Sequence, residues 1–399
     1  MASERASALP AARHRPGSAR LWLLGLYPLF LIALLVLLVV RFGPLGVFEA
    51  AFPPVEDLTI TRVRLTPGQF QVHVTNGGAD PVTIAQVLVD EAYWEHTVTP
   101  GRTIPRLGSA TITIPYPWVE GEAHEIVLVT ATGLTFSHTV DVAALSPQPT
   151  RAFLVTFTLL GVYVGVLPVF LGVLWFPFLR ALGRRWIHFF LALTAGLLVF
   201  LGVDALAEAL EAAAALPTAY HGTALVAVGT LGTMMLLVAV GRLTARRGPR
   251  PLVVAYLIAL GIGLHNLGEG LAIGAAFTLG EVALGAFLVI GFMLHNTTEG
   301  LGIVAPLART PPGMGHLVLL GLVAGVPTIL GVWLGGFTYS PVLAALFLAL
   351  GAGAIFQVVY EIARLMASDA AEGLATALNA AGFVAGLVIM YVTGLLVAV

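Results

Sequence analysis

Two short stretches of the chain carry residue types that could bind a metal ion. Residues 265–270 read HNLGEG and residues 295–300 read HNTTEG, so both contain His, Asn and, four positions after the His, Glu. On a helix, side chains four positions apart lie on the same face, which places each His beside the Glu of its own motif. Imidazole, carboxylate and amide groups together suit a borderline divalent metal ion. The candidate ligands are His265, Asn266, Glu269, His295, Asn296 and Glu299.

Both motifs lie inside apolar stretches, and this setting makes their polarity informative. An acidic residue at the centre of a membrane helix costs about 2.5–3.5 kcal/mol, so two carboxylates need interactions that offset about 5–7 kcal/mol. A cation shared by the two motifs would supply them. A buried polar network that joins the two helices is the alternative. The repetition of His, Asn and Glu on neighbouring segments favours the metal ion.

The composition is that of a polytopic membrane protein. Of the 399 residues, 58% are hydrophobic and 10% are charged, and the mean hydropathy is +0.95. The absence of Cys excludes disulfides, thiolate metal sites and cysteine nucleophiles. We expect residues 150–399 to form an all-α transmembrane domain of eight helices. The apolar segments that predict these helices are 152–178, 187–210, 222–242, 252–277, 282–304, 315–336, 341–364 and 374–398.

The first 146 residues are organised differently. Residues 1–20 predict a disordered cytoplasmic tail, and residues 21–42 predict a signal-anchor transmembrane helix, with a cleaved signal peptide as the alternative. Residues 49–146 alternate apolar and polar residues between Pro/Gly turns, which predicts an extracytoplasmic immunoglobulin-like β-sandwich of about seven strands. This domain is acidic overall. We interpret its four histidines as residues of solvated strand faces, with metal binding as the alternative: His73, His96, His124 and His138.

The arginines between the apolar segments predict the orientation of the chain. After an extracytoplasmic sandwich, the odd-numbered connections between segments contain Arg and the even-numbered connections contain none. Since basic residues favour cytoplasmic loops, this pattern places the N-terminus inside and both the sandwich and the C-terminus outside.

The segment order and the motifs resemble the ZIP family of divalent metal transporters, closest to its bacterial GufA-type branch, over about residues 150–399. The resemblance is carried by HNLGEGLAIG on the fourth core helix, HNTTEGLGIVAPL on the fifth, and Glu361 within GAIFQVVYEIARL on the seventh. It implies a binuclear metal site between the fourth and fifth helices, a 3+2+3 arrangement of inverted repeats, alternating access and a bacterial cytoplasmic (inner) membrane location. The primary site that it implies consists of His265, Glu269, His295 and Glu299, and the second site of Asn266, Asn296 and the shared carboxylates.

The chain departs from the family pattern at four positions. Gly268 and Thr298 stand where the family often has Pro before the Glu, so any unwinding would rely on glycine flexibility or on a back-bonding Thr hydroxyl. Val326 stands where the sixth helix commonly supplies a Glu, and Leu198 where the second helix often supplies a Met. We therefore expect one strong metal site and at most one weak one.

Other acidic residues predict a route for the ion. Asp204, Glu208 and Glu211 form one stripe on the second core helix and are candidates for an entrance pathway, although Glu208 and Glu211 also fit ordinary helix-end carboxylates. The resemblance makes Glu361 an exit-pathway ligand. A salt pair with Arg364, three residues later, is the alternative.

We expect a divalent metal transporter that takes up zinc, or iron, manganese or cadmium, into the cytoplasm, with no cofactor besides the transported ion and no enzyme activity. The alternatives are an intramembrane metal-dependent hydrolase, which would use the same residues to activate water, and a transport-inactive metal sensor or envelope interaction protein. The expected partners are divalent metal ions, membrane lipid, a second copy in a homodimer and an unknown envelope partner of the sandwich, but no nucleic acid. The sandwich is expected either to dock that partner or to shape the entrance.

Overall fold

The computed structural model describes residues 18–42, 56–244, 250–279, 282–338, 340–369 and 374–395. Contacts divide the chain into two units, Met1–Pro54 and Val55–Val399, which are described separately. In the first unit, helix α1 (Ser18–Phe42) covers the predicted signal-anchor segment. The predicted tail of residues 1–20 lies outside the described residues except for its last three, which begin α1.

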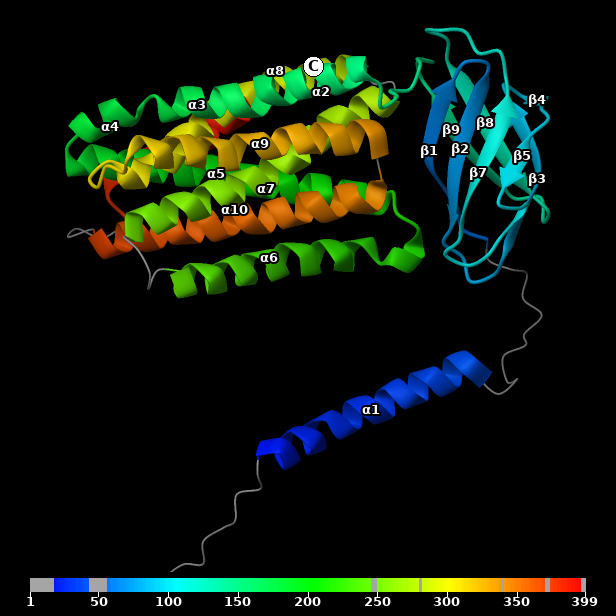
Figure 1. Ribbon diagram of the computed structural model, residues 1–399, viewed down its shortest axis with the longest axis horizontal. Coiled ribbons are helices and arrows are strands. Elements are labelled where there is room, and N and C mark those ends of the chain that lie inside the picture. The colour runs from blue at the N-terminus through cyan, green and yellow to red at the C-terminus, as the bar shows by residue number, and fades with distance from the viewer. Residues whose placement is uncertain are drawn as a thin grey trace, which may run out of the picture. The chain divides into compact units, whose positions relative to one another are not determined.

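The second unit begins with a β-sandwich (Figure 1). One sheet has the strand order β1-β2-β7-β5, and the other has the order β4-β3-β8-β9 with β6 paired to β3. Because successive side chains of a strand point to opposite faces, the apolar half of each strand turns inward, as with the fully buried Val72, Ile112 and Ile126. A two-sheet sandwich is thus confirmed. Its strands are β1 (Leu58–Thr66), β2 (Gln69–Asn76), β3 (Val82–Val89), β4 (Ala92–Tyr93), β5 (Thr97–Thr99), β6 (Thr103–Ile104), β7 (Ser109–Pro115), β8 (His124–Thr130) and β9 (Thr135–Val140).

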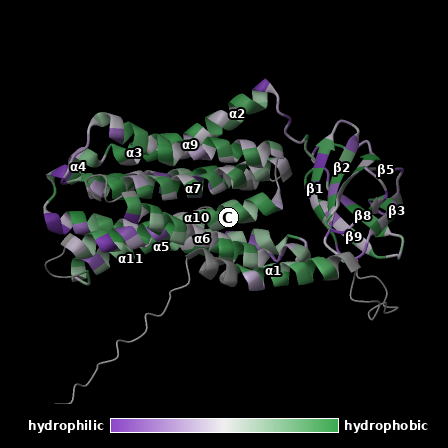
Figure 2. Ribbon diagram, turned by 60° about the horizontal axis from the view of Figure 1, so that its bottom comes forward, coloured by the Kyte–Doolittle hydropathy of each residue, from purple (hydrophilic) through white to green (hydrophobic). Residues whose placement is uncertain are grey.

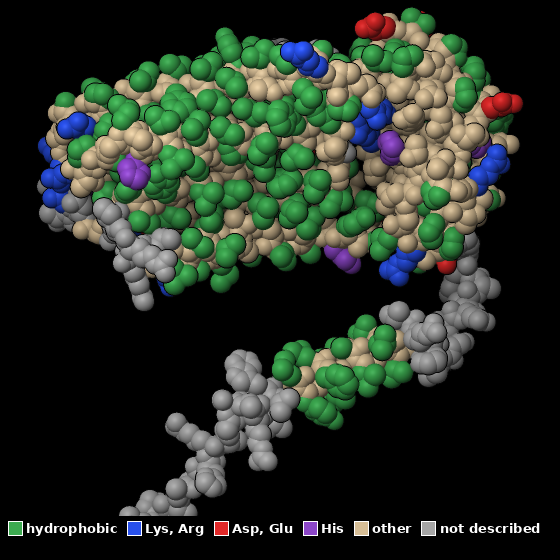
Figure 3. Space-filling view, viewed as in Figure 1, with side chains coloured by type: hydrophobic (Ala, Val, Ile, Leu, Met, Phe, Trp, Pro, Cys, Tyr) green, Lys and Arg blue, Asp and Glu red, His purple; other side chains and the backbone are tan. Residues whose placement is uncertain are grey.

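Eight helical segments in the described part of the second unit are long and apolar enough to cross a membrane. Hydrophobic residues run along these helices and hydrophilic residues gather near their ends (Figure 2), and apolar side chains cover the face of the bundle seen in Figure 3. The predicted membrane character is therefore confirmed. The elements are α2 (Arg151–Gly161), the π-helix η1 (Val162–Val166), α3 (Leu167–Val173), α4 (Phe176–Ala181), α5 (Arg184–Ala214), η2 (Thr218–Tyr220), α6 (Gly222–Thr244), α7 (Arg250–Leu279), α8 (Val282–Val304), η3 (Ala305–Leu307), α9 (Met314–Thr338), α10 (Pro341–Asp369) and α11 (Ala377–Leu395).

Glycine lets helix α7 approach helix α9 closely. A Cβ atom on Gly270 of α7 would lie 2.2 Å from the carbonyl oxygen of Thr328, and one on Gly335 of α9 would lie 2.1 Å from the carbonyl oxygen of Leu271. Neither position has room for a side chain, so the two backbones are in direct contact. Helix α7, which carries the first motif, is thus held in place by α9.

Helix α8, which carries the second motif, is held by α3 in the same way. A Cβ atom on Gly300 would lie 2.1 Å from the carbonyl oxygen of Val169, and one on Gly172 of α3 would lie 2.1 Å from the carbonyl oxygen of Thr297. Gly270 and Gly300 are the final residues of the two motifs. Each motif therefore ends in a glycine because a neighbouring backbone lies against it there.

The interpretation of His124 as a residue of a solvated strand face is wrong. His124 is 4% exposed, and its ring lies 5.5 Å from the Phe70 ring and 5.2 Å from the Tyr116 ring, centroid to centroid. Its Nδ1 is 2.8 Å from Oδ2 of Asp90. The reason is its position as the first inward-facing residue of β8, where strand alternation directs it into the core. The other three histidines of the sandwich are half-buried: His73, His96 and His138.

The Asp90 side chain makes the stability of the sandwich depend on pH. Burial opposes its ionisation, but hydrogen bonds from His124, from the Glu125 N–H and from Tyr116 outweigh burial and hold the pKa of Asp90 below its ordinary value. The folded state thus favours the carboxylate. Its stabilising contribution is complete above the ordinary aspartate pKa of about 3.9 and is lost as the pH falls through the lowered folded-state value.

We therefore expect the urea midpoint for unfolding of the sandwich to fall as the pH is lowered from about 5 to about 3, and to fall less in Asp90→Asn, which lacks the titrating group. Pulsed hydrogen exchange of β8 peptides in the full chain measures this midpoint. An equal dependence of the midpoint on pH in both proteins would show that Asp90 is not the group responsible.

Candidate metal centre

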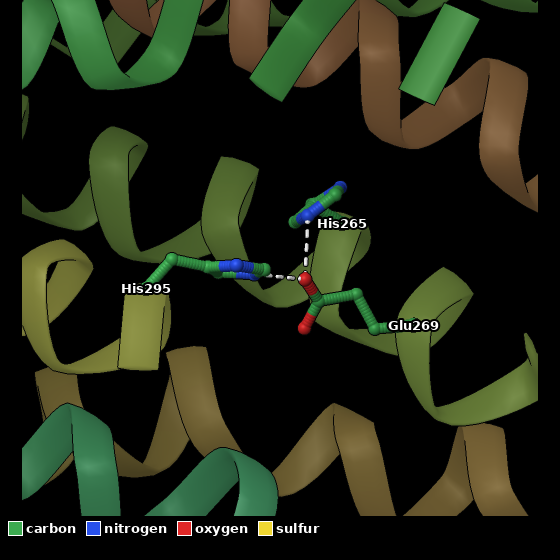
Figure 4. A group of neighbouring side chains, drawn as sticks. All are labelled: His265, Glu269 and His295. Carbon is green, nitrogen blue, oxygen red and sulfur yellow. Dashed lines mark hydrogen bonds and ion pairs between the residues drawn. The ribbon is translucent and has the colours of Figure 1, made fainter. Parts of the chain in front are cut away.

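Helices α7 and α8 bring three of the predicted ligands together inside the bundle (Figure 4). Nε2 of His265 lies 2.9 Å from Oε1 of Glu269, one turn later on α7. His295, from α8, directs its Nε2 to the same carboxylate oxygen. One ligand atom from each residue lies within 4.8 Å of the others, and all three side chains are buried. Two imidazoles and a carboxylate on two helices are a ligand set that suits a divalent metal ion.

Asn296 connects this group to an irregular part of the backbone. Its Nδ2 donates to Oε2 of Glu269 at 3.1 Å and to the carbonyl oxygen of Val164 at 3.0 Å. Val164 lies in the π-helical turn η1, four residues before Pro168, which has no N–H to offer. Because this carbonyl lacks the usual α-helical donor, it can accept from Asn296. The Asn296 side chain is thereby oriented and the Glu269 carboxylate is supported.

Several buried oxygen atoms beside the centre have no hydrogen-bond partner among the described residues. Asn266 donates its Nδ2 to the carbonyl oxygen of Ala324 at 3.1 Å, but its Oδ1 is unpaired, as is Oδ1 of Asn296. Both carboxylate oxygens of Glu299 are also unpaired. An unpaired buried polar group costs about 1–3 kcal/mol, and a charged one costs more. A cation bound to these oxygens would remove that cost.

The arrangement differs in one respect from what helical spacing predicts. The spacing places His295 beside Glu299 of its own motif, whereas the His295 imidazole contacts Glu269 of the other motif. Three of the four primary ligands implied by the resemblance thus form one group, and Glu299 lies outside it. Glu299 instead contributes to the unpaired oxygens described above.

The structure shows the contacts and the burial of residues at the positions that depart from the ZIP pattern. Both helices are continuous through the motifs, and the Thr298 hydroxyl donates to the carbonyl oxygen of His295 at 2.6 Å, the back-bonding expected of it. Val326 is 37% exposed and therefore lies at the surface of the bundle. Two residues later, Thr328 is fully buried, and its hydroxyl has no partner in the described part of the chain. Leu198 is buried in the core.

A cavity of about 340 Å³ joins part of the predicted entrance stripe to the centre. Asp204, Glu208 and His295 all line it, together with Phe200 and Phe292. Glu211 is exposed and does not line this cavity. The structure thus places two of the three stripe residues beside a ligand of the centre.

On helix α10, Glu361 is buried, with 4% exposure. Nη1 of Arg364 lies 3.8 Å from its Oε1, so the predicted salt pair is present, although the carboxylate is not on a solvated face. Gln357, one turn earlier, is fully buried, and neither its amide oxygen nor its nitrogen has a partner among the described residues. Gln357 and Thr328 were not among the predicted site residues. The sequence does contain a signal for Gln357, because it is a lone amide one turn before the Glu361 carboxylate in an apolar segment, where polar residues are usually functional.

No protein-family model matches the chain, and a comparison with curated proteins finds no match. The resemblance to the ZIP family therefore stands on the motif residues alone. Any functional assignment rests on those motifs and on the geometry of the centre.

Proposed function

We propose that the chain transports a divalent metal ion across a membrane. The observation that supports this most strongly is the convergence of His265 and His295 on one carboxylate oxygen of Glu269, inside an apolar bundle. A purely structural network would satisfy its own members, yet Glu299 and Asn266 leave buried oxygens unpaired. The motif resemblance to the ZIP family supports the same assignment.

The ligand types suggest two positions of unequal strength. Two nitrogen ligands and one carboxylate favour zinc or a similar transition metal at the group formed by His265, Glu269 and His295. The unpaired oxygens of Asn266, Asn296 and Glu299 offer a second, weaker position made only of oxygen. The transported ion is zinc, iron, manganese or cadmium in this proposal, with zinc as the first candidate.

The proposed route follows the buried polar residues. The ion enters through the cavity lined by Asp204 and Glu208, loses its water at the centre, and leaves past Gln357 and Glu361. Transfer occurs by alternating access in a 3+2+3 arrangement of inverted repeats around α7 and α8. In this proposal the sandwich is of the immunoglobulin-like type and lies outside a bacterial inner membrane, and the ion moves from that side into the cytoplasm. The N-terminus lies inside and the C-terminus outside.

Zinc uptake by liposomes that contain the purified chain tests the proposal itself, and the entrance residues test the route. We expect the double variant Asp204→Asn/Glu208→Gln to lower the uptake rate at low zinc concentration by about tenfold, because a cleft lined by one sign of charge raises the local concentration of its counter-ion. Equilibrium zinc binding by the centre should change much less.

Glu211→Gln is the matched control for the entrance variant, since Glu211 is exposed and lies outside the cavity. An equal loss of uptake in this control would show a general surface-charge effect. Unchanged uptake in the double variant would show that the ion does not enter through this cavity.

A further inference from the structure

The outer face of the sheet β1-β2-β7-β5 carries a basic row of side chains rich in hydroxyl groups. The strand register pairs Arg62 with His73, His73 with Thr111, and Thr111 with Thr99, so these four residues form one row across the sheet. Nδ1 of His73 lies 3.0 Å from the Thr111 hydroxyl.

A cavity of about 550 Å³ lies between this row and the ends of several helices of the same unit. The sheet contributes its basic row and the Thr75 and Ser109 hydroxyls, and the bundle contributes the α5–α6 connection, including Tyr220, and the start of α10 at Ser340 and Pro341. None of the described lining residues is acidic. In Figure 3, basic and His side chains lie next to each other on the part of the sandwich nearest the bundle.

Two contacts fasten the sheet to the helix ends around this cavity. Oδ2 of Asp57 accepts hydrogen bonds from the Thr218 hydroxyl at 2.7 Å and from the Thr218 N–H at 3.4 Å. Nη1 of Arg62 donates to the carbonyl oxygen of Phe337, near the end of α9, at 3.5 Å. The cavity is therefore bordered by elements that contact one another, at one end of the helical bundle.

The Arg62 guanidinium is only partly hydrogen-bonded by the described residues. Its Nε and Nη2 atoms are buried and make no hydrogen bond to any described residue. Burial, with Arg64 as a second cause, lowers the pKa of Arg62, so both effects disfavour its charged form. These two N–H groups form one edge of the guanidinium fork, which matches two oxygens of a phosphate or carboxylate group. A buried charge of this kind is stabilised by an oppositely charged ligand.

We infer that this cavity binds a phosphate group, with Arg62 as its main contact. The Arg62 side chain lines the cavity, and its Nε and Nη2 atoms, which are covered in this structure, reach the ligand when the guanidinium turns toward the cavity. The hydroxyls of Thr75, Ser109 and Thr111 lie on the same sheet face and offer further donors to the remaining oxygens, which suits a tetrahedral oxyanion better than a planar one. The phosphate comes either from a free phosphate anion or from the headgroup of an anionic lipid at the membrane surface. The inference does not depend on metal transport, because none of its residues belongs to the metal centre.

The test uses the full-length protein in detergent free of phospholipid, with inorganic phosphate as one probe and vesicles of phosphatidylglycerol, compared with phosphatidylcholine, as the other. Phosphate binding is measured by titration calorimetry and retained lipid by native mass spectrometry. We expect Arg62→Gln to weaken binding at least about tenfold and Arg62→Lys to restore it only in part, because Lys keeps the charge but lacks the fork. Arg106→Gln, at an exposed Arg of the sandwich outside the cavity, is the matched control and should bind like the wild type.

Binding of inorganic phosphate alone identifies a free anion, and selective retention of phosphatidylglycerol identifies a lipid headgroup. Hydrogen exchange of the wild type with and without each probe gives a measurement that does not depend on the folding of a variant, and β1 and β2 should be protected. Absence of binding and protection with both probes would overturn the inference. Equal binding by wild type and a folded Arg62→Gln variant would overturn it as well.

Discussion

Glu269→Gln should lower the affinity of the purified protein for zinc by more than about 100-fold. Loss of an outer-shell partner of a metal ligand typically costs 10- to 100-fold in affinity, and Glu269 is a candidate ligand in direct contact with both imidazoles. The substitution removes the negative charge and keeps the size of the side chain. Its effect on zinc binding therefore reports the charge of the ligand rather than a packing defect.

Titration of the apo-protein with zinc, in competition with a chelator of known affinity, measures this change. Glu211→Gln makes the same chemical change on an exposed residue of α5 and should leave zinc affinity as it is in the wild type. If Glu269→Gln bound zinc as tightly as the wild type, the three-residue group would not be the metal centre. The buried polar network would then be the better explanation.

Gly335→Ala should destabilise the helical bundle strongly. A Cβ atom at this position would lie 2.1 Å from the carbonyl oxygen of Leu271 and 2.8 Å from the backbone nitrogen of Ala275, so α7 and α9 would have to separate. Overpacking of a well-packed interior costs about 1–3 kcal/mol, and a backbone neighbour cannot move aside as a flexible side chain can. Because α7 carries His265 and Glu269, we expect weaker zinc binding as well as lower stability.

The midpoint of thermal unfolding in detergent measures this effect, and Gly232→Ala provides a matched control. Gly232 is an exposed residue of α6 with no atom within 4 Å of an added Cβ, so there the same change adds only the higher helix propensity of Ala, about 1 kcal/mol. The two substitutions should therefore act in opposite directions. A Gly335→Ala variant as stable as Gly232→Ala would show that α7 and α9 do not touch as described.

The strands and helices can be predicted well because each type has its own local pattern of apolar residues in the sequence. The strands of the sandwich follow from alternation, since a strand such as β2 turns every second residue into the core. The helices follow from apolar runs of spanning length. The contact between His265 and Glu269 follows from their spacing on one helix, and the structure places the two atoms 2.9 Å apart.

The remaining features depend on how elements pack, which no local pattern encodes. His295 reaches Glu269 rather than Glu299 because the rotation of α8 relative to α7 decides the pairing, and that rotation is fixed by contacts such as Gly300 against Val169. The π-helical turn whose carbonyl accepts from Asn296 is likewise a product of the tertiary structure. The basic row on the sheet likewise depends on tertiary structure. It forms only because the registers of three strand pairs align its four residues.

Zinc flux into liposomes shows most directly whether this centre carries a metal ion across the membrane. Purified wild type, Glu269→Gln and Glu211→Gln are reconstituted in liposomes that contain a zinc-sensitive dye. We expect flux through the wild type and through Glu211→Gln, and none through Glu269→Gln. If the wild type bound zinc through His265 and His295 but gave no flux, transport would be contradicted, and a metal sensor or an intramembrane hydrolase would take its place.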